Sequence, residues 1–265
     1  MGMSAGRQHI IAATVAAVLM LAGITGLYRL LQQTPPPLLE RVRQTGVLVV
    51  ATRNSPSTYF DGAQGPDGFE YVLVEEFARH LGVRVRYVFP PTLEALLDAT
   101  ARGTVHLAAA GLTITPARER KIGFSLPYRY VTEQMVYRLG SKKPRSLADV
   151  GPGELHVVAE SSHEETLRRL ASSDYPSLSW QRHAATSTGQ LLADLDRGEL
   201  RLTVADSDEV SLTRRLLAHV ATAFELGEPQ AIAWAFGRAG DGSLRLAINE
   251  FLQRFEEDGS LRRLR

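Results

Sequence analysis

A polar segment that follows an apolar run carries the clearest chemical signal in this sequence. Residues 105–110 are apolar and predict a buried strand, after which Thr115 and Pro116 occupy the N-cap and first position of a predicted helix. Arg118 falls in the first turn of that helix, beside backbone N–H groups that have no partner within the helix. Its guanidinium, these N–H groups and the hydroxyl of Thr113 would form a site for a carboxylate or another small anion. These residues alone are also consistent with a surface turn and a solvated arginine.

Two later segments place further polar residues at the ends of predicted elements. Ser162 begins a Ser-x-x-Glu capping box, so Ser162 and His163 lie at a helix N-terminus, which is a second place for an anion. Residues 202–205 predict a buried strand that ends at Asp206. The residues are also consistent with a solvated His163 and with an Asp206 that only caps the next helix.

The elements that must position these residues alternate along the chain. Strand-like apolar runs are separated by amphipathic helices, which have capping or stop signals. The predicted strands cover residues 46–52, 83–89, 105–110, 155–159 and 202–205, and the predicted helices cover 69–81, 92–102, 162–170, 187–198 and 243–259. Ser187 begins a second capping box, and Ser243 is the expected cap of the last helix. This order predicts α/β units with a mostly parallel sheet, in which ligands lie at the carboxyl ends of strands. The loop with Tyr59 and the turn with Arg118 both follow such ends.

The composition limits the classes of function. The chain has 265 residues, of which 44% are hydrophobic, and its formal net charge of +1 gives no reason to expect a nucleic-acid partner. It has no cysteine, which excludes disulfides, thiolate metal sites, a cysteine nucleophile and a lipid-anchored cysteine. The seven histidines are scattered, and no zinc-protease, phosphate-loop, dinucleotide or serine-nucleophile pattern is present in the sequence. We therefore predict no metal, no cofactor and no catalytic residue in this chain.

The N-terminal segment predicts an association with a membrane. Residues 10–28 are almost continuously apolar and long enough to span a bilayer, with Arg7 before them and Arg29 after them. The lack of a clear small-x-small cleavage site favours an uncleaved anchor over a cleaved signal peptide, and a buried core helix is a third alternative. We therefore expect an anchor or signal segment in residues 1–31 and a proline-rich linker in residues 32–40.

The segment around Arg118 also resembles the family-3 periplasmic solute-binding proteins. The pattern Gly-x-Thr-x-Thr-Pro-x-Arg starts at Gly111, and Phe-Ser-x-Pro-Tyr follows it and ends at Tyr128. The resemblance implies that Arg118 and Thr113 bind the α-carboxylate of an amino acid, in a site that includes Gly111. It also implies that Asp206 pairs with the α-ammonium group, so the expected ligand is a small zwitterion.

The same resemblance implies a two-lobed α/β fold. This fold is the type II periplasmic-binding-protein clamshell with two hinge crossings, here preceded by one N-terminal hydrophobic helix. Residues 41–265 would form it, with 41–134 and 231–265 in the first lobe and 135–230 in the second. The apolar run 231–236 is the expected return to the first lobe. Closure is expected to bring together residues from both lobes, namely Arg118, Tyr59, Ser162 and Asp206.

Several stretches resemble, more narrowly, the membrane-bound lytic murein transglycosylase F family. They are residues 161–167, 175–180, 204–210 and 226–230, followed by Trp234. Proteins of that family have an N-terminal membrane-targeting segment, a solute-binding-type domain and then a lysozyme-like domain that cleaves peptidoglycan. This sequence ends where the catalytic domain is expected to begin, and no glutamate stands in a comparable setting. We therefore expect no catalysis by this chain.

Three functions follow from these patterns. The favoured one is a regulatory or sensing domain that binds an amino acid or a peptidoglycan stem peptide and acts on a catalytic murein hydrolase domain. The second is the receptor of an amino-acid importer, whose partner would be a transporter permease. The third is an enzyme on the same clamshell, as in the periplasmic dehydratases that resemble these binding proteins. The favoured function places the chain in the cell envelope, with a periplasmic domain that is anchored to or associated with a membrane.

Overall fold

The computed structural model describes residues 14–26 and 35–264, in two units that divide between Pro37 and Leu38. Residues 14–26 are helical and exposed. Within the two described ranges, no helix has both the length and the hydropathy needed to cross a bilayer. The segment predicted to contact a membrane, 10–28, extends beyond the described residues at both ends.

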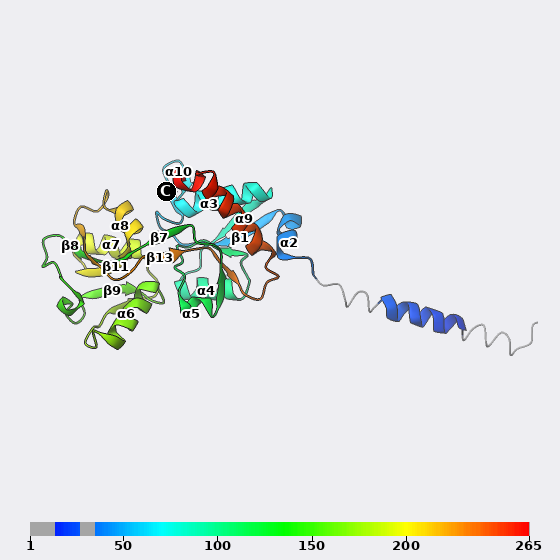
Figure 1. Ribbon diagram of the computed structural model, residues 1–265, viewed down its shortest axis with the longest axis horizontal. Helices are drawn as coiled ribbons and strands as arrows, with labels where there is room; N and C mark the ends of the chain where they lie inside the picture. Colours follow the sequence, from blue (N-terminus) through cyan, green and yellow to red (C-terminus); the bar gives the residue numbers. More distant parts are fainter. Residues whose placement is uncertain (1–13, 27–34, 265) are drawn as a thin grey trace, which may run out of the picture. The chain divides into compact units, whose positions relative to one another are not determined.

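The first sheet of the larger unit has five strands in the order β4-β1-β5-β14-β6, of which β1 is labelled in Figure 1. Their bounds are β1 Val47–Ala51, β4 Arg84–Val88, β5 Leu107–Ala108, β6 Ile122–Phe124 and β14 Ala235–Gly237. Strand β1 is parallel to β4 and β5, whereas β14 is antiparallel to β5 and β6. This sheet and the helices packed on it are called the first lobe below.

The alternation of side chains along β1 explains how helices cover both faces of this sheet. Leu48 and Val50 pack in a core with α3 (Phe69–Leu81), α9 (Ser243–Glu257), α2 (Leu38–Thr45) and α10 (Ser260–Leu264). Val49 and Ala51 point to the opposite face and pack against α4 (Leu93–Ala101). A strand buried on both faces is uniformly apolar, as the sequence of β1 is.

The second sheet, in the second lobe, has the order β10-β9-β11-β8-β12. Its strands are β8 Glu133–Arg138, β9 Leu155–Val158, β10 Gln181–His183, β11 Leu202–Asp206 and β12 Val220–Glu225. Helix α6 (Ser162–Ser173) packs on one face through Leu167, and α7 (Thr188–Arg197) packs on the other through Leu191 and Leu195. The remaining elements of this lobe are the short helices η1 (Leu147–Asp149) and α8 (Ser207–Thr213).

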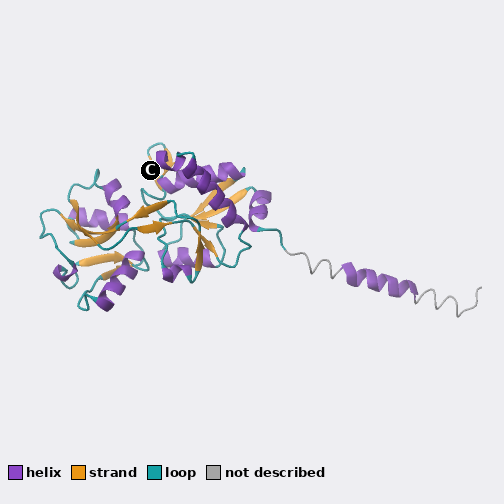
Figure 2. Cartoon of the chain, in the orientation of Figure 1, coloured by secondary structure: helices purple, strands orange, loops and turns teal. Residues whose placement is uncertain are grey.

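Two antiparallel strands connect the lobes. They are β7 (Arg129–Val131) and β13 (Gln230–Ile232), which form a separate two-stranded sheet between the two larger ones (Figure 2). A hairpin, β2 (Phe60–Gly62) with β3 (Gly65–Asp67), and the single-turn helix α5 (Pro116–Glu119) complete the first lobe. The predicted two-lobed α/β fold with two crossings is confirmed.

The helix starts show which local signals were interpreted correctly. Thr115 and Ser187 are N-caps as predicted. The hydroxyl of Thr115 accepts the N–H of Arg118, and the hydroxyl of Ser187 accepts the N–H of Gln190. The predicted cap at Ser162 is wrong by one residue. Ser161 has the extended backbone of an N-cap, its Oγ accepts the N–H of Glu164, and α6 continues to Ser173 rather than residue 170.

One further expectation, near the C-terminus, needs correction. The cap of α9 is Gly242 rather than Ser243, whose Oγ accepts the N–H of Leu39 instead. The apolar run 231–236 contains parts of two strands, because the chain changes partner within it. It leaves β13, which pairs with β7, passes through Trp234 and enters β14, which pairs with β6.

Candidate functional site

The arginine that the sequence singled out is buried between the lobes. Arg118 lies in α5, directly after the turn that follows β5, and is 5% exposed. Its Nη1 donates to the carbonyl of Thr113 at 3.0 Å, and its Nη2 donates across to the carbonyl of Glu160, in the second lobe, at 3.2 Å. Burial lowers the pKa of Arg118 to about 10, although Glu165 and other acids oppose this shift. It therefore remains a cation at neutral pH.

The N-terminus of α6 presents two of the predicted residues to the first lobe. The hydroxyl of Thr113 donates to the Oγ of Ser162 at 3.2 Å. The next residue, His163, is 4% exposed, and its Nε2 lies 3.1 Å from Oδ1 of Asp206. Burial alone lowers the pKa of His163, but the Asp206 carboxylate outweighs that effect and raises it to about 9. The two side chains therefore form a buried ion pair.

Asp206 occupies the N-cap position of α8 without capping it. Its side chain accepts no hydrogen bond from the first turn of that helix and instead contacts His163. The structure thus disfavours the simpler alternative, in which this aspartate only ends a strand and begins a helix. Asp206 follows the buried strand β11, so its carboxylate lies at the carboxyl end of the second sheet, where ligands of α/β proteins bind.

A cavity of about 20 Å³ brings the predicted residues of both lobes together. Its wall includes five residues of the predicted site, namely Gly111, Arg118, Ser162, His163 and Asp206. A second cavity of about 20 Å³ lies beside it and shares Gly111 and Asp206. Cavities of this size hold water or an ion but not an amino acid, so a larger ligand enters only when the lobes separate.

Tyr59 is the predicted site residue that the structure does not bring to the others. Its ring packs among Tyr71, Tyr87 and Phe89, with ring centroids 5.0 to 5.5 Å away, and its hydroxyl donates to Asp61. It lines neither of the two small interlobe cavities. The role predicted for it therefore has no support from its position.

Arg53 and two buried acids also line these cavities and were not predicted. Arg53 lies two residues after the end of β1 and donates twice to the carbonyl of Ala110, at 3.0 and 2.7 Å. The general rule that ligands bind at strand ends could have identified it. Glu209 lies three residues after Asp206, and burial with two neighbouring aspartates raises its pKa to about 7.

Glu70 had no signal in the sequence. It lies in the first turn of α3, is 2% exposed, and accepts the N–H of Gly111 at 2.7 Å and the hydroxyl of Tyr128. Burial raises its pKa to about 7, against the effect of these hydrogen bonds and of nearby arginines. Only the folded chain brings this acid to the motif that begins at Gly111.

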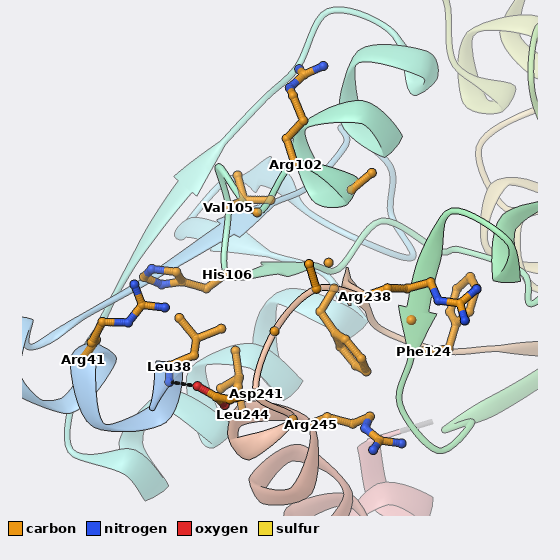
Figure 3. A pocket seen from close by; sticks show the side chains of 18 residues that line it. Leu38, Arg41, Arg102, Val105, His106, Phe124, Arg238, Asp241, Leu244 and Arg245 are labelled. Atoms are coloured by element: carbon orange, nitrogen blue, oxygen red, sulfur yellow. Dashed lines mark hydrogen bonds between the residues drawn. The ribbon is translucent and has the colours of Figure 1, made fainter. Parts of the chain in front are cut away.

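Two larger hollows lie outside this cluster. One of about 610 Å³ opens at the edge of the cleft, between residues 52–56 and 89–93 of the first lobe and residues 185–193 and 213–217 of the second. The other, of about 540 Å³, lies within the first lobe and contains none of the predicted residues. Figure 3 shows its arginines, 41, 102, 238 and 245, pointing to different sides of the hollow rather than converging on one point.

Comparison with known proteins gives one family match. The model of the bacterial extracellular solute-binding proteins, family 3, matches residues 48–265. The chain is 37% identical over 253 residues to membrane-bound lytic murein transglycosylase F 1 of Alkalilimnicola ehrlichii, which is 96% of the chain and 51% of that protein. It is 38% identical over 246 residues to the transglycosylase F of Pseudomonas fluorescens, with coverages of 91% and 50%. The chain therefore spans about half the length of the curated relatives it matches.

Solved structures with the same fold are more distant in sequence. A mutant of ArgBP from T. maritima has a TM-score of 0.76 at 21% identity, covering 85% of the chain and 96% of that protein. An ancestral arginine-binding protein bound to arginine has a TM-score of 0.73 at 22% identity, with coverages of 83% and 96%. At these identities the likeness shows the two-lobed fold alone.

Proposed function

The chain belongs to the bacterial extracellular solute-binding proteins of family 3, and from that premise we propose that its interlobe cleft binds an amino acid or a peptidoglycan stem peptide. In this proposal Arg118 and Thr113 bind the α-carboxylate and Asp206 binds the α-ammonium group. Gly111, Ser162 and His163 complete the walls of the site. The bound chain acts as a non-catalytic regulatory domain in the cell envelope, where closure of its lobes signals to a murein hydrolase domain.

One observation carries the binding proposal. Arg118 and Asp206 have opposite charges, come from opposite lobes and line the same buried cavity. A zwitterion that is removed from water needs fixed partners for both of its charges, and this pair supplies them when the lobes close around the ligand, further apart than they stand here. Ligand binding and closure are therefore coupled.

The cell-wall part of the proposal is supported by the relatives. Two are named membrane-bound lytic murein transglycosylase F and are 37% and 38% identical over nearly all of this chain. This chain matches about half the length of each of those proteins. A partner domain that cleaves glycan strands and a membrane association near the N-terminus belong to this proposal.

A second candidate is the receptor of an amino-acid importer. It is favoured by the family match, because family 3 is described as extracellular proteins that bind solutes. The two candidates differ in ligand, because an importer receptor binds free amino acids, whereas a cell-wall sensor binds a stem peptide or its fragments.

Calorimetric titration of the full chain with free amino acids and with murein stem peptides tests the proposal. Arg118→Ala should weaken binding at least about tenfold, because it removes a charged hydrogen-bonding partner of the carboxylate. Arg120→Ala is the matched control, since Arg120 is an exposed arginine immediately after the same helix. Binding of a stem peptide that is weakened by Arg118→Ala but not by Arg120→Ala supports the sensor. Tight binding of one free amino acid supports the importer receptor. No binding by the folded chain contradicts both.

A further inference from the structure

Three buried side chains meet where the second sheet faces α6. Glu133 is the first residue of β8, Asp206 is the last residue of β11, and the two are paired across these antiparallel strands. His163 reaches them from the first turn of α6. One nitrogen or oxygen atom from each of the three lies within 4.8 Å of the other two, and the residues are 2%, 9% and 4% exposed.

Glu133 has a buried carboxyl group without a protein partner. Neither of its oxygens accepts a hydrogen bond from any residue in the described part of the chain, and neither is accessible to solvent. The Nδ1 atom of His163 is buried and unpartnered in the same sense. An unpaired buried carboxylate costs several kcal/mol, so folded proteins pair such groups or use them to coordinate metals.

The donor set distinguishes between cations. An imidazole nitrogen with two carboxylate oxygens is a set that suits divalent transition metals such as Zn²⁺, whereas Mg²⁺ and Ca²⁺ prefer oxygen ligands alone. Two ligands of a tetrahedral zinc ion lie about 3.3 Å apart, given metal–ligand distances of about 2.0–2.1 Å. The observed 3.1 Å between His163 Nε2 and Asp206 Oδ1 is close to that separation, and a bound ion would displace the proton that this pair shares, releasing it to solvent.

We propose that Glu133, His163 and Asp206 form a binding site for a divalent transition metal ion of the zinc class. This replaces the expectation from sequence that the chain holds no metal site. Sequence inspection missed it because the three ligands are 30 and 43 residues apart in sequence, with no spacing motif, and only the folding of the second lobe collects them. The site shares His163 and Asp206 with the proposed amino-acid site, but its test does not depend on that function, since the metal alone is the ligand.

The test is a metal titration of the full chain after removal of metals with a chelator. Zn²⁺ binding is measured by calorimetry, and Co²⁺ binding by the visible absorption of the bound ion. We expect one ion per chain. Mutation of a group that only hydrogen-bonds to a metal ligand typically lowers metal affinity about 10–100-fold. Removal of a ligand itself, in Glu133→Gln or His163→Gln, should therefore lower the affinity for Zn²⁺ at least about 100-fold. Either variant suffices if the other fails to fold by circular dichroism.

A second histidine site provides the matched control. His156 Nδ1 and His183 Nε2 lie 3.0 Å apart, and the two rings stack in a partly buried position. This pair is the rival binding site for the same ions, and His183→Gln removes it. The proposal requires that His183→Gln retain the cobalt absorption and that the Glu133 and His163 variants lose it. Loss in His183→Gln alone, or no binding by the parent chain, overturns it.

Discussion

At the scale of single residues, each of the two main charged side chains of the cleft is held by polar partners. Arg118 is held by two carbonyl groups, one from each lobe, and Asp206 is held by His163. Glu160, which supplies the second carbonyl, has a positive φ of 60°, a conformation uncommon for a residue with a side chain. Its position beside Arg118 makes this strained backbone part of the interlobe contact.

Glu70 should give the chain a pH-dependent stability. Its pKa is raised from 4.5 to about 7 in the folded chain because it is buried. The folded state therefore holds a proton that the unfolded state loses between these two values. The contribution of Glu70 to the free energy of unfolding should be largest below pH 4.5 and should fall by up to about 3 kcal/mol as the pH rises to 7.

Urea unfolding at about pH 5 and about pH 8 measures this effect when Glu70→Gln is compared with the parent chain. The amide keeps a similar shape but cannot ionise, so the variant should lose less stability between the two pH values than the parent chain does. Other groups titrate in both proteins and cancel in the comparison. An identical pH dependence in the two chains would show that Glu70 is not neutral in the folded state at low pH.

At the scale of elements, sequence patterns predict what is encoded by neighbouring residues. The N-caps at Thr115 and Ser187 follow from a hydroxyl residue before an amphipathic run, and the two-lobed fold follows from the order of the runs and from the family pattern. The cap of α6 was assigned to the wrong one of two adjacent serines. Local composition permits either residue, and the extended backbone of Ser161 decides between them.

Residues that join the site only through tertiary structure were not predictable in this way. Glu70 and Glu133 belong to separate elements and carry no motif, and Arg53 follows a strand end without further signal. Tyr59 was selected because its loop follows a strand end, but its ring packs against other aromatic residues. Position at a strand end thus identifies the correct region of the fold but not which side chains point into the cleft.

The start of α3, which positions Glu70, should depend on one glycine. Gly68 precedes this helix with a φ of 128°, and a Cβ atom there would lie 2.5 Å from the carbonyl oxygen of Thr58. Gly68→Ala should therefore destabilise the chain by at least about 2 kcal/mol, because the cost of backbone strain at a positive φ is added to the cost of a clash with backbone atoms.

Gly65→Ala is the matched control for this substitution. Gly65 also has a positive φ, 116°, but a Cβ atom there would meet no other atom within 4 Å. It should cost only the conformational strain, about 1 kcal/mol. The difference between the urea unfolding midpoints of Gly68→Ala and Gly65→Ala measures the cost of the clash alone. Equal midpoints would mean that the loop at Thr58 moves away at little cost.

At the scale of the whole binding unit, closure of the lobes is held by contacts that do not need a ligand. The hydroxyls of Thr113 and Ser162 meet across the cleft, and Ser55 in the first lobe donates to Glu209 in the second at 3.4 Å. Arg129, in the connecting strand β7, stacks over the ring of Phe69 at 3.8 Å and pairs with Asp208 of α8. A single cationic side chain thus links both lobes.

Removal of this link should favour the open state of the ligand-free chain. Asp208→Asn deletes the charge that Arg129 contacts in the second lobe, where both side chains are mostly buried, while the first-lobe contact with Phe69 remains. Small-angle X-ray scattering should show a larger radius of gyration for the variant, because separated lobes extend the particle. Glu154→Gln is the control, since Glu154 forms a comparable ion pair with Arg201 within the second lobe alone. If both variants scatter as the parent chain does, closure is maintained by the hydroxyl contacts and by Arg118 rather than by Arg129.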